Sequence, residues 1–139
     1  PLSAERLKDR GTPDESKGMP MQFDPKTLRY DANGLVPAVA QDHRTGQVLM
    51  LAWMNAESIG KTLETGLVTY WSRSRKSLWV KGATSGHLQH LVEMRLDCDR
   101  DALLILVEQT GPACHTLRDS CFHTAVRDGA EVILSAPLG

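Results

Sequence analysis

Apolar and polar side chains alternate along residues 87–98, and this period of two limits what the chain can fold into. The apolar ones fall on even positions, namely Leu88, Val92, Met94, Leu96 and Cys98. Only His90 and Leu91 break the pattern. Because successive side chains of a strand point to opposite faces, we predict a half-buried β-strand here. If the alternation continues, Cys98 lies on the apolar side, and Asp97 and Asp99 lie on the polar side.

Other segments are also typical of strands. Residues 103–107 are apolar throughout, which predicts a strand covered on both faces. Residues 35–40 and 48–53 flank the polar segment 42–46 and predict a β-hairpin. Two shorter strands are expected at 67–71 and 78–80.

A short helix is expected over residues 56–64. Asn55 is a favourable N-cap and Gly66 a favourable stop, while Ile59 and Leu63 are spaced four apart. We therefore predict an α+β fold, a sheet-dominated single domain with one or two short helices. The chain of 139 residues is long enough for one core. Residues 1–20 show no apolar period and are expected to form a mobile N-terminal arm, with the domain over 21–139.

Composition narrows the functional class. Three cysteines, an odd number, and the lack of an apolar leader at the start of the sequence argue against a disulfide framework, so we expect a cytoplasmic protein. The longest apolar run, residues 103–107, is far shorter than the roughly 20 residues of a membrane span. A net charge of -1 provides no general attraction for nucleic acid. We expect neither a membrane nor a nucleic-acid partner.

The cysteines are close together in the sequence, at Cys98, Cys114 and Cys121. Three thiolates suit zinc and leave a coordination position open for water. The alternative is that they are small buried hydrophobes, although the polar surroundings of Cys114 and Cys121 favour a metal. His115 is the candidate proton acceptor beside such a site, or else a loop-packing residue. His115 and His123 are also candidates for a fourth ligand, which would make the zinc structural.

Carboxylates alternate along Asp97, Asp99 and Asp101. Such a spacing suits a hard cation such as magnesium, because carboxylates this close repel one another unless a cation or solvent intervenes. A solvated acidic strand end is the alternative. The sequence is not an EF-hand loop, because Ala102 replaces the required glycine and an apolar strand follows.

A basic and aromatic stretch covers residues 70–82. Its cations are candidates for phosphate binding, with nearby hydroxyls adding hydrogen bonds. The cations are Arg73, Arg75, Lys76 and Lys81. Single-stranded RNA is an alternative ligand, and a solvated hairpin with tryptophans in the core is another. Thr84 and Ser85 lie in a second small polar loop of the kind that wraps anions.

Taken together, these motifs resemble phosphoribosyl-AMP cyclohydrolases of histidine biosynthesis. The resemblance covers residues 34–123 and rests on the order of four motifs. They are Gly34-Leu35-Val36-Pro37-Ala38-Val39-Ala40-Gln41-Asp42, Tyr70-Trp71-Ser72-Arg73-Ser74-Arg75, Asp97-Cys98-Asp99-Arg100-Asp101, and Ala113-Cys114-His115-Thr116 with Ser120-Cys121-Phe122.

The resemblance implies an intertwined homodimer that opens the adenine ring of 1-(5-phosphoribosyl)-AMP at the N1–C6 bond. It implies zinc bound by Cys98 of one subunit and Cys114 and Cys121 of the other, and we expect this zinc to activate the attacking water. Magnesium would be bound by Asp97, Asp99 and Asp101. His115 would manage the proton, and substrate would contact a set of polar and aromatic residues. These are Trp71, Ser72, Arg73, Arg75, Thr84 and Ser85.

Two positions depart from the family pattern. Ala83 stands where the family usually has glutamate, and Leu117 stands where it usually has glycine. The first removes a carboxylate near the expected substrate, and the second alters a turn. The sequence ends soon after the last motif, so we expect a monofunctional enzyme. A zinc nucleobase deaminase would attack the same purine carbon, but its H-x-E and P-C-x-x-C signatures are missing.

Overall fold

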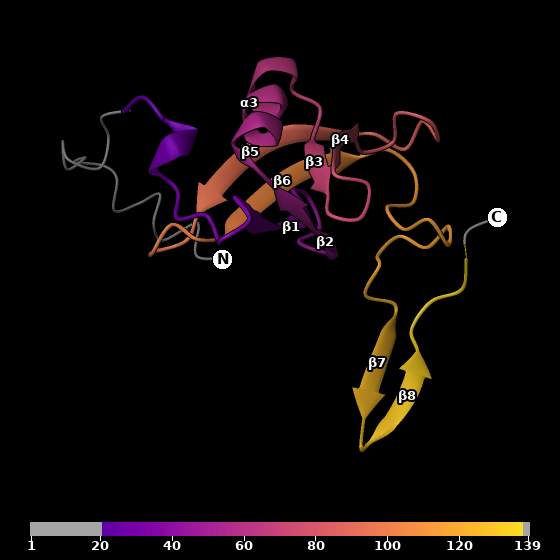
Figure 1. Ribbon diagram of the computed structural model, residues 1–139. Helices are drawn as coiled ribbons and strands as arrows, with labels where there is room; N and C mark the ends of the chain where they lie inside the picture. Colours follow the sequence, from indigo (N-terminus) through magenta and orange to yellow (C-terminus); the bar gives the residue numbers. More distant parts are fainter. Residues whose placement is uncertain (1–20, 138–139) are drawn as a thin grey trace, which may run out of the picture.

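The computed structural model describes residues 21–137, which form one curled sheet, a helix packed on it and a separate hairpin (Figure 1). The elements in chain order are the 3-10 helix η1 (Pro25–Thr27), β1 (Val36–Asp42), β2 (Val48–Met54), the α-helix α3 (Ala56–Thr65), β3 (Thr69–Ser72), β4 (Ser77–Val80), β5 (Gln89–Leu96), β6 (Leu103–Gln109), β7 (Thr124–Arg127) and β8 (Ala130–Ile133). The predicted α+β class is confirmed. The predicted arm over residues 1–20 lies outside the described residues.

The main sheet has six strands in the order β4-β3-β2-β1-β6-β5. The predicted hairpin is present as β1 and β2, and β1 also pairs in parallel with β6. The sheet curls until its two edges meet at residues 66–68. On the β5 side, Val68 N–H donates to Gln89 O at 3.0 Å. On the β4 side, the Val68 carbonyl accepts from Lys81 N–H at 3.0 Å. The curl encloses a core that includes Met54, Tyr70 and Ile105, each with no exposed surface.

Helix α3 begins at the predicted residue, Ala56, and ends at Thr65, one residue after the predicted end. Asn55 and Ser58 form a reciprocal capping box, and Gly66 ends the helix in the left-handed conformation at φ +78°. Ser58, Ile59 and Thr62 form the buried face. Leu63, four residues after Ile59, is 44% exposed and does not belong to this buried face.

Strand β5 contains a bulge that the alternation did not reveal. Leu91 pairs with Val107, whereas Glu93 pairs with the preceding residue Leu106, so Val92 is the extra residue. The bulge leaves Val92 51% exposed, and its predicted place on the apolar side is wrong. The break noted at His90 and Leu91 marks this change of register.

The end of β5 also differs from the prediction. The strand ends at Leu96, and Cys98 lies exposed in the turn that follows. The expectation that the alternation would place Cys98 on the apolar side is therefore wrong, because a turn does not keep the strand period. Strand β6 is covered on one face only within this chain. Leu103, Ile105 and Val107 are buried, whereas Leu104 and Leu106 are half-buried.

The hairpin of β7 and β8 belongs to a second, two-stranded sheet and stands away from the curled sheet (Figure 1). Val126 and Ile133 are 74% and 60% exposed on it. None of the helices in the described part of the chain has the length and apolar character of a membrane span.

Candidate metal and nucleotide site

Two of the three cysteines lie side by side in the loop between β6 and β7. Cys114 is held in a turn, where its N–H donates to Arg118 O at 3.0 Å. Cys121 is fixed on the start of β2, because its N–H donates to Leu49 O at 2.7 Å. Ser120 strengthens this attachment by donating its hydroxyl to Val48 O at 2.7 Å. The loop thereby presents two thiols together, Cys114 buried and Cys121 exposed.

The pKa values of the two thiols are shifted in opposite directions. Burial, followed by the charge of Cys114 and the hydrogen bond to it, raises the pKa of Cys121 to about 11. Desolvation acts in the same direction on Cys114, but hydrogen bonds from Thr116 and Cys121 outweigh it and lower the pKa of Cys114. Thr116 Oγ1 donates to Cys114 Sγ at 3.0 Å. Cys114 is therefore the thiol that ionises first, which suits a metal ligand.

Cys98 lies at the other end of strand β6. This strand runs from Leu103, next to the Cys98 turn, to Gln109, next to the loop that carries Cys114 (Figure 1). Seven residues of extended chain span roughly 20 Å. Among residues 21–137, the three thiols of one chain do not form a common donor set. A site that uses all three requires a second copy of the chain.

The two candidate histidines do not complete a site within one chain. His115 is exposed next to Cys114, and His123 lies beside Thr124, with Nδ1 3.3 Å from Thr124 Oγ1. Within the described residues, neither histidine joins the two thiols in a set of three donor atoms within 4.8 Å of one another. The alternative of a closed site from Cys114, Cys121 and a histidine of the same chain is not formed.

The three predicted carboxylates do come together. Asp97, Asp99 and Asp101 each place one oxygen within 4.8 Å of the others in the turn after β5. Asp97 Oδ1 closes the turn by accepting from the N–H groups of Asp101 at 2.9 Å and Ala102 at 3.2 Å. Arg100 turns away from the cluster, since its Nη2 donates to Thr27 Oγ1 at 2.6 Å. No ion pair of the described residues neutralises the carboxylates.

Hydrogen bonds within the cluster change the pKa values of its carboxyl groups. Hydrogen bonds with Asp99 and Asp97, together with their charges, raise the pKa of Asp101 to about 6. Desolvation acts upward on Asp97 as well, but the hydrogen bonds that it accepts from Asp101 and Ala102 lower its pKa. Magnesium prefers oxygen ligands, and here three carboxylates converge with no cationic side chain paired to them among the described residues. The residues present therefore fit that ion.

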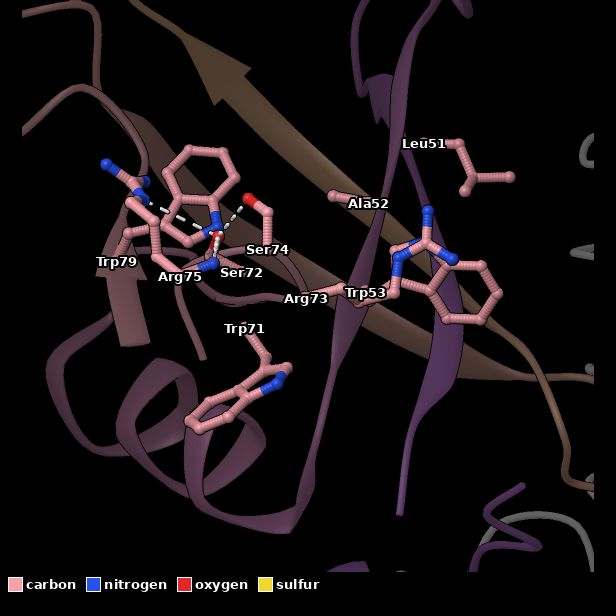
Figure 2. A pocket seen from close by; sticks show the side chains of 9 residues that line it. All are labelled: Leu51, Ala52, Trp53, Trp71, Ser72, Arg73, Ser74, Arg75 and Trp79. Atoms are coloured by element: carbon pink, nitrogen blue, oxygen red, sulfur yellow. Dashed lines mark hydrogen bonds between the residues drawn. The ribbon is translucent and has the colours of Figure 1, made fainter. Parts of the chain in front are cut away.

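A pocket of about 570 Å³ lies over strands β2, β3 and β4. Figure 2 shows the Arg73 guanidinium over the Trp53 ring on one side, 4.5 Å from its centroid. On the other side, the Ser72 hydroxyl accepts from Arg75 N–H at 3.2 Å and lies 3.4 Å from Ser74 Oγ (Figure 2). The pocket is lined by Leu51, Ala52, Trp53, Trp71, Ser72, Arg73, Ser74, Arg75 and Trp79.

The structure thus brings together four of the six predicted substrate residues, namely Trp71, Ser72, Arg73 and Arg75. Thr84 and Ser85 are exposed in the turn after β4 and do not line this pocket. The prediction missed Trp53, whose pairing with Trp71 across β2 and β3 follows from the sheet. The sequence places Trp53 in a predicted strand, but only the pairing of β2 with β3 brings it beside the basic stretch.

The fold and these donor sets define a small sheet-dominated α+β protein with a thiol pair, a carboxylate cluster and an arginine-lined pocket. The sequence profile described as phosphoribosyl-AMP cyclohydrolase matches residues 50–123. A phosphoribosyl-AMP cyclohydrolase of Cereibacter sphaeroides is 71% identical over 119 residues, which cover 86% of this chain and 100% of the relative. A relative of the same name from Ruegeria pomeroyi is 69% identical over 85% of this chain and 99% of the relative. Another from Paracoccus denitrificans is 67% identical over 83% of this chain and 95% of the relative.

The chain belongs to the phosphoribosyl-AMP cyclohydrolase family. The resemblance predicted from the four motifs is confirmed, and with it the prediction of an enzyme of the hydrolase class.

Proposed function

We propose that this protein hydrolyses the adenine ring of 1-(5-phosphoribosyl)-AMP at the N1–C6 bond, a step of histidine biosynthesis. The observation that carries the proposal is the 71% identity to a phosphoribosyl-AMP cyclohydrolase over that relative's whole length. In this substrate the second phosphoribosyl group on N1 withdraws electrons from the ring, which makes C6 electrophilic. Water adds at C6, and the N1–C6 bond opens.

Side chains of the pocket would bind and orient the substrate. The guanidinium groups of Arg73 and Arg75 have the fork geometry that recognises phosphate in pairs of hydrogen bonds. Trp53 and Trp71 add flat apolar surface of the kind on which a base stacks. The exposed His115 beside Cys114 would accept a proton from the attacking water.

The thiols and carboxylates would hold two metals. Zinc would be bound by Cys114 and Cys121 together with a third thiolate, and magnesium by Asp97, Asp99 and Asp101. Zinc held by three thiolates would supply an activated water for attack on C6. The lowered pKa of Cys114 supports the first assignment, and the unpaired carboxylates support the second.

The third thiolate would come from a second copy of the chain. Cys98 is exposed and lies at the far end of β6 from the thiol pair, so it is free to complete the site of a partner subunit. Leu104 and Leu106 are half-buried in the apolar part of β6 and support an interface, because a dimer would cover this face. We therefore include a homodimer with shared zinc sites in the proposal.

Turnover tests the activity directly. Purified protein with zinc and magnesium is mixed with phosphoribosyl-AMP, and ring opening is followed by ultraviolet absorbance. We expect conversion by the parent and a loss of conversion by Cys98→Ala. Absence of turnover in a folded protein that contains both metals would contradict the proposed function.

Mixing two inactive variants tests the shared site. Cys98→Ala and Cys114→Ala are each expected to be inactive, but a heterodimer of the two keeps one complete site. Random reassociation of equal amounts should restore about one quarter of the parent activity, because half of the dimers are mixed and each has one of two sites. A mixture that stays inactive while forming dimers would contradict a site shared between subunits. Cys114→Ala mixed with Cys121→Ala is the control, since both lesions fall in the same half-site and no recovery is expected.

A further inference from the structure

Lys81 lies next to the thiol pair and apart from the basic stretch with which the sequence grouped it. Its ammonium group donates a hydrogen bond to the carbonyl of Ala113, the residue before Cys114. It also lies 5.9 Å from the centroid of the Trp79 ring. Lys81 is absent from the lining of the arginine pocket. Its side chain therefore points to the thiol loop.

The backbone of Lys81 is held firmly in this position. Its N–H donates to Val68 O at 3.0 Å, where the two edges of the sheet meet. The next residue, Gly82, has a φ of +84°, and a Cβ at this position would meet the His87 carbonyl carbon at 2.3 Å. Only glycine fits this turn, so the chain leaves β4 along one path.

The charges around the Lys81 ammonium point to the thiols as its partners. It is half-buried, and no carboxylate pairs with it in the ion pairs of residues 21–137. A partly buried cation is costly unless an anion compensates for it. Lys81 lowers the pKa of both Cys114 and Cys121 through its charge, although other causes are larger. The charge of the ammonium therefore acts on the two sulfur atoms, which would both be thiolates when they bind zinc.

We propose that Lys81 is a positioning residue of the thiol site, which fixes the Cys114 loop through the Ala113 carbonyl and balances the negative charge of the thiolates. This inference rests on the proposed function, in which the thiols bind zinc. Three thiolates around a divalent zinc ion leave one net negative charge. The ammonium of Lys81 brings the sum to zero without occupying a coordination position.

Zinc affinity of the purified full-length protein tests this role without relying on activity. We would measure it by competition with a chromophoric chelator for the parent, Lys81→Met, Lys81→Gln and Lys81→Arg. Lys61→Met is the matched control, because its ammonium lies on helix α3 and pairs with Glu64 at 3.8 Å. Thermal unfolding of each metal-free variant reports whether it folds.

We expect Lys81→Met to bind zinc about 10- to 100-fold more weakly than the parent, the usual cost of losing a residue that supports metal ligands. Lys81→Gln keeps a donor but not the charge, so it should also bind weakly. Lys81→Arg keeps both and should restore affinity. If Lys81→Met has the same zinc affinity as Lys61→Met, the proposal is overturned. If Lys81→Gln has the same zinc affinity as the parent, the charge role is overturned. If Lys81→Met does not fold, the zinc affinities of Lys81→Gln and Lys81→Arg are compared instead.

Failure of this inference is distinguishable from failure of the proposed function. Zinc binding by the parent is compared first with binding by Cys114→Ala. If the parent binds no more zinc than this variant, the metal assignment itself is wrong, whatever Lys81 does. If the parent binds zinc through Cys114 and the Lys81 variants bind equally well, only the role of Lys81 is wrong.

Discussion

Leu117 adopts a left-handed conformation in the turn that presents Cys114. Its φ is +66°, and its N–H donates to Cys114 O at 2.9 Å. A side chain with a Cβ is strained in this conformation, by roughly 1–2 kcal/mol. Glycine would adopt this conformation without that strain, so the turn next to the thiol pair is less stable with leucine than it would be with glycine.

Leu117→Gly should therefore relieve strain. The matched control is Leu117→Ala, which also removes the side chain but keeps the Cβ. We expect the glycine variant to have a free energy of unfolding about 1 kcal/mol higher than the alanine variant. Urea denaturation of both variants measures the difference. Equal stability, or a more stable alanine variant, would show that the turn is not strained.

If the carboxylate cluster binds magnesium, as we propose, Asp101 should make that binding depend on pH. Its pKa is raised to about 6, so the cluster keeps a proton that a bound cation must displace. Magnesium affinity should be constant above about pH 7 and fall up to about tenfold per pH unit below about 6. Calorimetric titrations with magnesium between about pH 5 and 7.5 check this. An affinity unchanged across this range would contradict a magnesium site at these carboxylates.

Low pH should weaken magnesium binding, but the same raised pKa means that low pH stabilises the metal-free protein. A carboxyl whose pKa is higher in the folded state stabilises the fold when protonated. This contribution is present below the unfolded value of 3.8 and is lost as the pH rises through about 6. Asp101→Asn should remove it, as pH-dependent thermal unfolding without magnesium would show.

At the level of elements, the bulge in β5 decides which side chains reach the core. Leu91 packs against the core before the bulge, and Met94 and Leu96 pack against it after the bulge. Val92 is turned outward between them. A sequence period averages over a strand, and one extra residue shifts every position beyond it.

Two adjacent substitutions locate this bulge in solution. Leu91→Ala should lower the free energy of unfolding by about 2 kcal/mol or more, whereas Val92→Ala should lower it by about 0.5 kcal/mol or less. Chemical denaturation of the two variants measures both values. The unbroken alternation would give the opposite order, with Val92 as the costly position.

At the level of the whole molecule, the thiol pair and Cys98 lie at opposite ends of β6. If zinc joins them between subunits, the metal also joins the subunits. Removal of zinc by a chelator should then shift the dimer toward the monomer, which sedimentation velocity at several protein concentrations would detect. Cys98→Ala should show the same shift without a chelator. A dimer equally stable with and without zinc would contradict a shared site.

Local sequence determined the elements and the chemistry of the groups in this protein. Some features depend only on neighbours within a few residues, so the sequence predicts them. They are the capping residues of α3, the hairpin of β1 and β2, and the cluster of three alternating aspartates. Tertiary structure decided which distant groups meet. Trp53 joins Arg73 because β2 pairs with β3, and Lys81 reaches Ala113 because the curled sheet brings the end of β4 to the loop after β6. These contacts depend on strand order and sheet curvature, which arise from packing of the whole core and leave no periodic signal in the sequence.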